Sequence, residues 1–398
     1  MISARLLFGF LCALAAVTAP VSAQSIVPLT SFGGGDGWFA PGEGGYQFLT
    51  GPLTATTQTN TERGLAYSAA TNHLYLVSRA NVGGDAIHVR VLDAATGVDT
   101  GVELNDTGIA GGTFPINKVA VGTDGAIYGA NLRTGVTATA TYKIYKWDNE
   151  TSTPAVVVDT LPLGNDTRIG DDFDAIGGGI SAQLVAGHAQ SGTNSGVAGL
   201  NGYAIINPNT ASVTNVMFSG TPPNIGDFRL GITFSDSDTV LGTQGGTTGT
   251  PAVPNPVHVT DFVGGTGTLQ MSFTLQTVNE RPMDFAIVGG VPVLATMEVG
   301  GPAATPLATN GIVRIYDITN PAAPIPLLMG TTISGTPVSN GNFAGELKWG
   351  AITGNTATLY ALNTNNGIQA FVVTIPEPSA AALLGFGLAS FAIRRRRA

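Results

Sequence analysis

A pattern of about 55 residues repeats along the chain and restricts the folds that it can adopt. Each copy contains an alternating apolar segment, then Asp or Asn, then a small polar turn and a second apolar segment. Alternation with period two is typical of strands, and Asp and Asn favour turns because their side chains can bond the backbone two residues on. We expect five such residues to cap turns: Asp93, Asp148, Asn207, Asp261 and Asp317, which are 55, 59, 54 and 56 positions apart.

A second pattern precedes each of these segments and indicates two strands joined by a short turn, as in residues 63–79 and 281–298. Four strands per repeated unit are typical of a β-propeller. We predict an all-β fold of six four-stranded blades, since two unrelated β-sandwiches would not explain a steady repeat. The six units begin near Arg63, Lys118, Asp172, Arg229, Arg281 and Glu346.

The sixth unit is short, and its outer strand is expected from the N-terminal region. Two segments are candidates for this closing strand, residues 25–32 and residues 53–58. Closure of this kind would remove exposed sheet edges. The glycine-rich residues 31–48 are expected to form a surface loop. The predicted organisation is a signal peptide (1–23), a closing strand with its loop (24–62), the propeller (63–375) and a C-terminal tail (376–398).

The charge of the chain argues against nucleic acid as a partner. The formal net charge is −9, with 17 basic and 26 acidic residues. Five arginines and one glutamate lie in the predicted leader and tail, so 12 basic and 25 acidic residues remain in the body, a net charge of −13. A surface of this sign repels phosphate backbones.

The N-terminus has the three parts of a secretory signal peptide: Arg5, an apolar stretch from Leu6 to Val17, and small residues before a cleavage site between Ala23 and Gln24. The single cysteine, Cys12, lies inside this leader, and Leu11 before it does not fit a lipoprotein signal. We therefore expect an exported mature chain that contains no thiol.

The body of the sequence contains no G-x-S-x-G, H-E-x-x-H or P-loop motif. Asp171, Asp172 and Asp174 are candidate ligands for Ca²⁺, which accepts irregular sets of oxygen atoms. An exposed acidic turn explains the three carboxylates equally well, so neither a catalytic residue nor a cofactor is predicted. Three of the four histidines precede or lie among expected strand residues and are expected to be structural. The three tryptophans are expected to serve packing, although a tryptophan could also stack on a sugar ring.

Charged residues gather near the expected starts of the innermost strands, where propellers usually place functional groups. The set mixes both signs, which favours a hydrated channel whose charges pair with one another. Its members are Glu62, Arg63, Lys118, Asp172, Asp174, Arg229, Arg281, Asp284, Glu346 and Lys348.

The tail combines a Pro-Glu-Pro triplet (Pro376, Glu377 and Pro378), an apolar stretch over residues 379–393, and four terminal arginines (Arg394, Arg395, Arg396 and Arg397). A helix of 15 residues would span about 22 Å, less than the ~30 Å hydrocarbon core. The arginines would keep the C-terminus cytoplasmic and the body outside the inner membrane. The helix could stop transfer, but it suits a transient signal better than a permanent anchor.

This order of parts resembles the PEP-CTERM sorting signal, over about the last 25 residues. The resemblance implies transient insertion in the inner membrane of a Gram-negative bacterium, recognition by an exosortase and release to the cell envelope or the extracellular matrix. By this analogy Pro376, Glu377 and Pro378 are the recognition residues and Arg394 to Arg397 the topogenic charges. More loosely, the body is similar to uncharacterised propeller-like domains of other exported proteins.

The function expected from these features is non-enzymatic, with the propeller binding exopolysaccharide or another surface protein. A second hypothesis is a secreted metal-dependent hydrolase, similar to lactonases or phosphatases, using Asp172, Asp174, Asp284 and Glu346. A third is a purely structural component without a small ligand.

Overall fold

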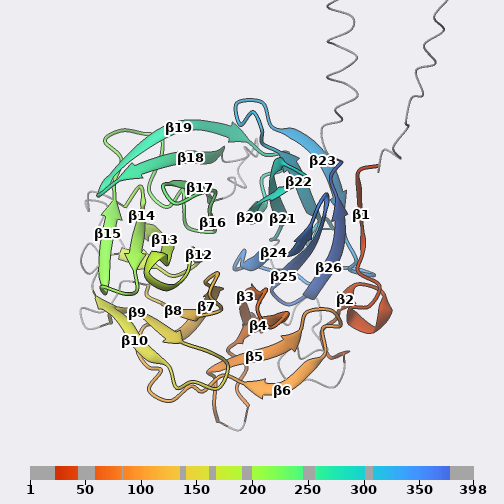
Figure 1. The fold of residues 1–398 in the computed structure, drawn as a ribbon, viewed down its shortest axis with the longest axis horizontal. Coiled ribbons are helices and arrows are strands. Elements are labelled where there is room, and N and C mark those ends of the chain that lie inside the picture. The colour runs from red at the N-terminus through yellow and green to blue at the C-terminus, as the bar shows by residue number, and fades with distance from the viewer. Residues whose placement is uncertain are drawn as a thin grey trace, which may run out of the picture.

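The computed structural model describes residues 23–43, 59–82, 84–134, 140–160, 167–190, 200–244, 256–300 and 308–376. Within these ranges the strands form six antiparallel sheets arranged around a central axis (Figure 1), and no α-helix is present among them. The innermost strands β3, β7, β12, β16, β20 and β24 contact one another in a closed ring. The predicted six-bladed propeller is confirmed, and two separate β-sandwiches are excluded.

The first three blades follow the repeat in sequence order. Blade 1 contains β3 (Glu62–Ser68), β4 (His73–Ser78), β5 (His88–Asp93) and β6 (Asp99–Glu103). Blade 2 contains β7 (Phe114–Val121), β8 (Ile127–Leu132), β9 (Tyr142–Trp147) and β10 (Ala155–Thr160). Blade 3 contains β11 (Thr167–Ile169), β12 (Asp174–Ile176), β13 (Gln183–Gln190), β14 (Tyr203–Asn207), β15 (Ser212–Val216) and the 3₁₀ turn Gly179–Ser181.

The other three blades complete the ring. Blade 4 contains β16 (Gly231–Phe234), β17 (Thr239–Thr243), β18 (Pro256–Val263) and β19 (Thr266–Thr274). Blade 5 contains β20 (Glu280–Val288), β21 (Val291–Glu298), β22 (Val313–Asp317) and β23 (Ile325–Gly330). Blade 6 contains β24 (Gly345–Thr353), β25 (Thr356–Asn363), β26 (Gly367–Thr374), β1 (Ser25–Pro28) and the short β2 (Trp38–Phe39).

The inner strand of blade 3 is interrupted. Strands β11 and β12 both pair with β13, and residues 170–173 bulge out between them. Gly170 allows this break because its backbone has a φ of 97°, and a Cβ there would lie 2.1 Å from the carbonyl oxygen of Asn131. The bulge carries Asp171 and Asp172, so it decides which parts of the channel these carboxylates face.

The N-terminal segment closes the ring, as predicted. Strand β1 pairs antiparallel with β26, with Ser25 opposite Thr374 and Pro28 opposite Phe371, so the outer strand of blade 6 comes from the other end of the chain (Figure 1). The alternative closing segment, residues 53–58, lies outside the described residues.

The glycine-rich segment after β1 differs from the predicted surface loop. Residues Gly33–Gly35 form a 3₁₀ turn and β2 pairs with β26. Phe32 is fully buried and Phe39 nearly so, and the ring of Phe32 lies 5.9 Å from that of Tyr360. The prediction was wrong here because it weighed the glycines and not the two phenylalanines, whose burial ties the segment to blade 6. Residues 44–58 lie outside the described ranges.

Three of the five expected turn residues cap turns as predicted. The carboxylate of Asp93 accepts a hydrogen bond from the backbone N–H of Thr96 at 2.8 Å. Asn207 accepts one from Asn209 at 2.9 Å, and Asp317 accepts one from Thr319 at 2.7 Å.

The other two turn positions are corrected by the structure. Asp148 lies in the turn after β9 and pairs with Lys146, while its neighbour Asn149 accepts the bond from the Thr151 N–H at 3.0 Å. Asp261 lies inside β18 and accepts a bond from the Thr239 hydroxyl at 2.9 Å. The prediction was wrong for Asp261 because Phe262 and Val263 continue the ladder with β19.

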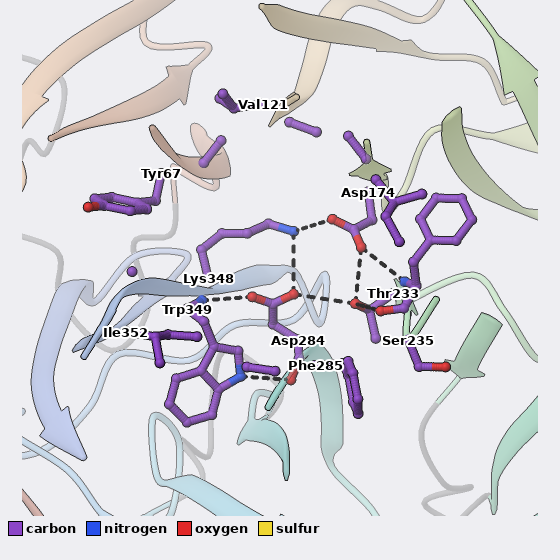
Figure 2. A pocket seen from close by; sticks show the side chains of 17 residues that line it. Tyr67, Val121, Asp174, Thr233, Ser235, Asp284, Phe285, Lys348, Trp349 and Ile352 are labelled. Atoms are coloured by element: carbon purple, nitrogen blue, oxygen red, sulfur yellow. Dashed lines mark hydrogen bonds and ion pairs between the residues drawn. The ribbon is translucent and has the colours of Figure 1, made fainter. Parts of the chain in front are cut away.

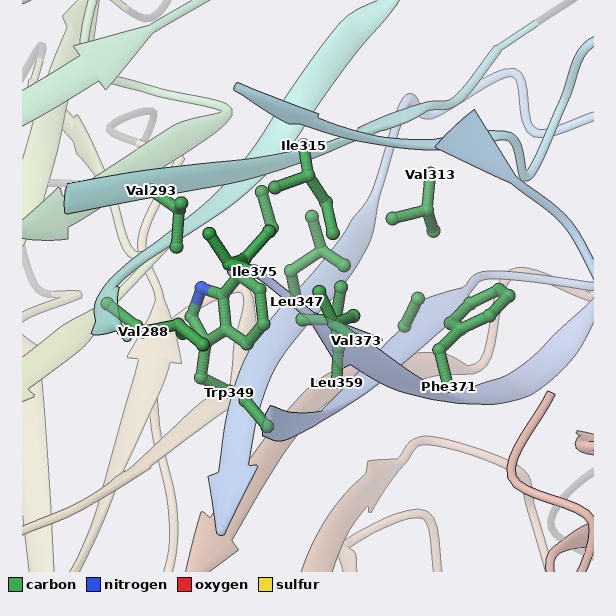
Figure 3. Packing of buried hydrophobic residues seen from close by; sticks show 14 of the residues in the cluster. Val288, Val293, Val313, Ile315, Leu347, Trp349, Leu359, Phe371, Val373 and Ile375 are labelled. Carbon is green, nitrogen blue, oxygen red and sulfur yellow. The ribbon is translucent and has the colours of Figure 1, made fainter. Parts of the chain in front are cut away.

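The apolar core lies between neighbouring blades. The largest described cluster joins blades 5 and 6, where Val293 and Ile315 pack against Leu359, Val373 and neighbouring residues (Figure 3). Ile375, directly after β26, is also buried there, and its N–H donates to the carbonyl of Asn355 at 2.8 Å. The folded body therefore extends to the residue before Pro376.

Among the described residues, no helix is long and apolar enough to cross a membrane. The predicted membrane helix over residues 379–393 and the signal peptide core over residues 6–17 lie outside those residues.

Candidate functional site

The inner strands bring two layers of opposite charge onto the propeller axis. Side chains two positions apart point to the same face of a strand. Glu346 and Lys348 on β24 therefore face the channel together, as Asp172 and Asp174 do at the end of the blade 3 bulge. We call the charged group around Lys118 the upper layer. The group around Lys348, which lies at the C-terminal ends of the inner strands, is the lower layer.

The upper layer is a buried three-residue cluster. The Nζ of Lys118 lies 2.8 Å from Oε2 of Glu346 and 3.2 Å from Oδ1 of Asp172. It also donates to the carbonyl of Gly345 at 2.8 Å. Burial raises the pKa of Glu346 to about 8 and also raises that of Asp172. Burial opposes the charged form of Lys118, but Glu346 and Asp172 outweigh it and raise the pKa of Lys118.

The lower layer faces a cavity of about 370 Å³ at the C-terminal ends of the inner strands (Figure 2). The Nζ of Lys348 lies 2.8 Å from Oδ1 of Asp174 and 3.9 Å from Oδ1 of Asp284. The hydroxyl of Thr233 lies 3.0 Å from the carboxylate of Asp174 and 3.3 Å from that of Asp284. The backbone N–H of Trp349 donates to the Asp284 carboxylate at 2.7 Å. Burial, as the largest cause, raises the pKa of Asp284 to about 7.

These contacts confirm the predicted pairing of channel charges, but the predicted hydration is wrong for the paired groups. Lys118, Asp172 and Glu346 are each at most 2% exposed. The difference arises because the six inner strands converge closely enough to exclude solvent between the paired side chains. The paired groups therefore form a buried plug on the axis.

The three candidate calcium ligands lie against three different cations. Asp171 accepts two bonds from Arg168, Asp172 pairs with Lys118, and Asp174 pairs with Lys348. In the part of the chain that the structure describes, no group of three or more His, Cys, Asp or Glu side chains could hold a metal ion.

The opposite mouth of the channel, at the N-terminal ends of the inner strands, is lined by arginines. We call it the arginine mouth and define it by Arg63, Arg79, Arg168 and Arg229, which line a cavity of about 440 Å³. The walls of the cavity also include Phe114 and Phe343, together with Leu132, Thr134, Gly341 and Asn342.

Sequence reasoning placed Arg63, Arg229 and Arg281 at strand starts but missed Arg79 and Arg168. Arg79 directly follows β4, and Arg168 lies in the short β11, so neither is at the start of an innermost strand. A repeat alignment could have found Arg79, since Arg133 directly follows β8 at the equivalent position in blade 2.

The described histidines have structural surroundings, as predicted for three of them. His73 lies 2.6 Å from Glu150, and His258 lies 3.0 Å from Asp227. His88 is next to Glu103, and His188 is fully buried.

The tryptophans also serve packing. The indole N–H groups of Trp38, Trp147 and Trp349 donate to backbone carbonyls at 2.7, 2.7 and 3.2 Å. Trp147 is fully buried, and Trp349 packs between blades 5 and 6 (Figure 3).

The predicted processing residues are only partly described. Ala23 and Gln24 are exposed just before β1, and Pro376 is half-buried. Glu377, Pro378 and Arg394 to Arg397 lie outside the described residues.

Two family matches cover most of the chain. The "Domain of unknown function (DUF4623)" matches residues 46–325, and the "PEP-CTERM protein-sorting motif" matches residues 374–397. The second match confirms the resemblance seen in the tail. No curated protein matches the chain.

Two solved structures are similar to the chain, and the first of them supports the fold. A DUF4623 family protein from Bacteroides eggerthii is 16% identical, with a TM-score of 0.58, covering 82% of this chain and 73% of its own. A calcium-binding protein, regucalcin, from Agrobacterium tumefaciens is 12% identical, with a TM-score of 0.46, and the match covers 81% of this chain and 92% of that protein. The DUF4623 model matches well over half of the chain. The chain therefore belongs to the DUF4623 family, and it carries a PEP-CTERM sorting motif at its C-terminus.

Proposed function

We propose that this protein is a non-enzymatic binding module of the cell envelope or extracellular matrix, associated with exopolysaccharide. The PEP-CTERM motif implies export to the cell envelope and processing by an exosortase. Transient insertion in the inner membrane of a Gram-negative bacterium, after cleavage of the signal peptide by the secretion machinery, belongs to the same proposal.

The observation that carries the binding role is the buried plug of ion pairs on the propeller axis. Lys118 and Lys348 already pair with the carboxylates that face the channel. Buried pairs of this kind define one arrangement of a core. The plug blocks the middle of the channel, so solvent reaches only its two mouths. A partner would therefore bind at one of the mouths.

The binding role is tested with the protein purified after export. It is applied to a glycan array and to exopolysaccharide prepared from the producing bacterium. Saturable binding of the exopolysaccharide is expected. Turnover of a lactone or phosphate ester without glycan binding would overturn the proposal, and so would a complete lack of glycan binding, which would favour a purely structural component or a protein partner.

A metal-dependent hydrolase is the second candidate, and two carboxyls with raised pKa values could serve it as catalytic acids. Burial raises the pKa of Asp284 to about 7 and that of Glu346 to about 8, and catalytic acids often have pKa values near neutrality. Elemental analysis of the exported protein separates the candidates. Stoichiometric metal, together with a rise in unfolding temperature on adding Ca²⁺, would favour the hydrolase.

A further inference from the structure

The arginine mouth concentrates positive charge in an acidic protein. Residues 24–375 contain eight arginines, and five of them gather at this mouth: Arg63, Arg79, Arg168 and Arg229 line its cavity, and Arg281 packs behind Phe343. Among the described residues that line the cavity, none is acidic. The carboxylate of Asp171 forms ion pairs with both Arg168 and Arg229.

Arg63 is a buried cation at the arginine mouth that forms no hydrogen bond with the Asp171 carboxylate. Its side chain lines the cavity, the residue is 4% exposed, and among the described residues its Nε and Nη1 have no hydrogen-bond partner. A buried guanidinium without a partner is costly, and structures normally pair such a group. Burial lowers the pKa of Arg63 to about 10, which still leaves it charged at neutral pH. Asp171 and Glu62 attract this charge from nearby, but in the part of the chain that the structure describes no anion is hydrogen-bonded to its Nε or Nη1.

Two neighbouring arginines are fixed in place by the protein. Arg79 lies over the ring of Phe114, 3.6 Å from its centroid, and donates to the carbonyl of Asn60 at 2.9 Å. Arg281 lies over Phe343 at the same distance and donates to the carbonyl of Gln244 at 3.1 Å. Cation–π contact and carbonyl bonds hold these two guanidinium planes in place.

The wall formed by Phe343 carries backbone strain. Phe343 has a φ of 55°, a left-handed conformation that is unfavourable for a bulky residue. The structure maintains it through the stacking on Arg281 and a bond from the Phe343 N–H to the carbonyl of Asn340 at 3.0 Å. Such outliers cluster at ligand sites, where the surrounding structure compensates for the strain.

We propose that the arginine mouth binds the oxyanion group of an acidic sugar, with Arg63 as the central donor. Asp171 already shows the geometry expected for a bound carboxylate, since its two oxygens accept two parallel hydrogen bonds from Arg168. Guanidinium groups recognise carboxylate, sulfate and phosphate in this bidentate manner. The choice of a saccharide rests on the proposed function.

The size and walls of the cavity favour a sugar acid over a bare inorganic ion. A volume of about 440 Å³ lies in the range of small-molecule sites and exceeds the need of a single ion. Phe114 and Phe343 offer apolar faces for ring C–H groups, and Thr134 and Asn342 stand among the lining residues as neutral polar groups.

The test is calorimetric titration of the full exported protein with glucuronate, glucose, sulfate and phosphate. Glucuronate is expected to bind with one-to-one stoichiometry, more tightly than either inorganic anion, while glucose should not bind. The affinity should fall as sodium chloride is raised, because salt screens the charges. Binding of none of the anions would overturn the inference, and tighter binding of sulfate or phosphate would overturn the assignment to a sugar acid.

Variants then locate the site. Arg63→Met and Arg229→Gln should each weaken glucuronate binding by about ten-fold or more, the usual loss when a charged hydrogen-bond donor is removed. Lys146→Gln removes the same charge from the exposed pair with Asp148 and should bind as the wild type. Wild-type affinity in both arginine variants would overturn the assignment of the site.

Folding of the variants is monitored by thermal unfolding. Arg63→Met removes an unpartnered buried cation, so its unfolding temperature should equal or exceed that of the wild type. The result is separable from the proposed function. If the protein binds glucuronate but not exopolysaccharide, the proposed function alone is contradicted. If Arg63→Met binds exopolysaccharide as the wild type does, this inference alone is contradicted.

Discussion

Lys118 and Glu346 lie 228 positions apart in the sequence, yet the Nζ of Lys118 is 2.8 Å from Oε2 of Glu346 on the propeller axis. They belong to β7 and β24, in blades 2 and 6, and blade 1 separates these blades along the ring. The contact therefore depends on closure of the whole ring, and the stability of the ring should depend on this contact in turn.

Replacing Lys118 by Met should destabilise the protein strongly. The change leaves Asp172 and Glu346 buried without their cation, and breaking a buried pair in this way costs about 3–5 kcal/mol. Urea unfolding at pH 8 measures the loss in the free energy of unfolding. Lys146→Met, which breaks only the partly exposed pair with Asp148, should cost about 1 kcal/mol or less. Equal losses in the two variants would contradict the role of the plug.

The free energy of unfolding should fall between about pH 4 and pH 7. Burial raises the pKa of Glu62 from an ordinary 4.5 to about 7 and that of Asp284 from 3.8 to about 7, so the folded state holds these protons more tightly than the unfolded state. Stability from this source is complete below the ordinary pKa and is lost as pH rises through the folded value. Each carboxyl contributes a slope of up to about 1.4 kcal/mol per pH unit.

Glu62→Gln should make this pH dependence shallower. Glutamine imitates the protonated acid and can keep the bonds from the hydroxyls of Thr61 and Ser78, which now reach Glu62 at 2.8 and 3.3 Å. Urea unfolding of both proteins across this pH range measures the two slopes. An unchanged slope would show that Glu62 does not titrate in this window.

Phe32→Ala should weaken closure of the ring. The ring of Phe32 is fully buried against Phe39 and Tyr360, and truncation of a buried Phe costs about 3–5 kcal/mol. Val27→Ala in β1, where the side chain is 47% exposed, should change stability by about 0.5 kcal/mol or less. Thermal and urea unfolding compare the two. A loss below 1 kcal/mol for Phe32→Ala would show that the N-terminal segment is not part of the stable core.

Glu377→Ala should leave uncleaved precursor in the inner membrane. The charged residue lies between two prolines that keep the triplet extended, and the matched sorting motif begins at residue 374. Fractionation and intact mass of the protein measure the outcome. Asp148→Ala, which removes an exposed carboxylate from the body, should be processed normally. A wild-type mass that still includes Ala398 would show that the tail is a permanent anchor.

Much of the architecture could be predicted because it depends on local patterns. The alternating segments and their turns specify four strands per unit, and Asp93 and Asp317 cap turns by bonds to residues two or three positions away. The prediction fails at Asp261 because β18 and β19 stay paired past it, so the turn falls at Gly264 and Gly265 instead. The position of Phe32 could not be predicted from local patterns, since its burial depends on Tyr360, more than 300 positions away.

By itself, the sequence indicated six blades, closure by the N-terminal region and the sorting signal, since repeat spacing, alternation and a contiguous motif are all read along the chain. It left two candidate segments for the closing strand, and the structure shows β1 (Ser25–Pro28) in that place. Only the tertiary structure decided which charges neutralise one another and which do not. Asp171, Asp172 and Asp174 are close neighbours in sequence, yet they face three different cations. Arg63, meanwhile, lines a mouth with three other arginines. The physical reason is that Coulomb energy and desolvation depend on distances through space and on burial, and closure of the ring sets both.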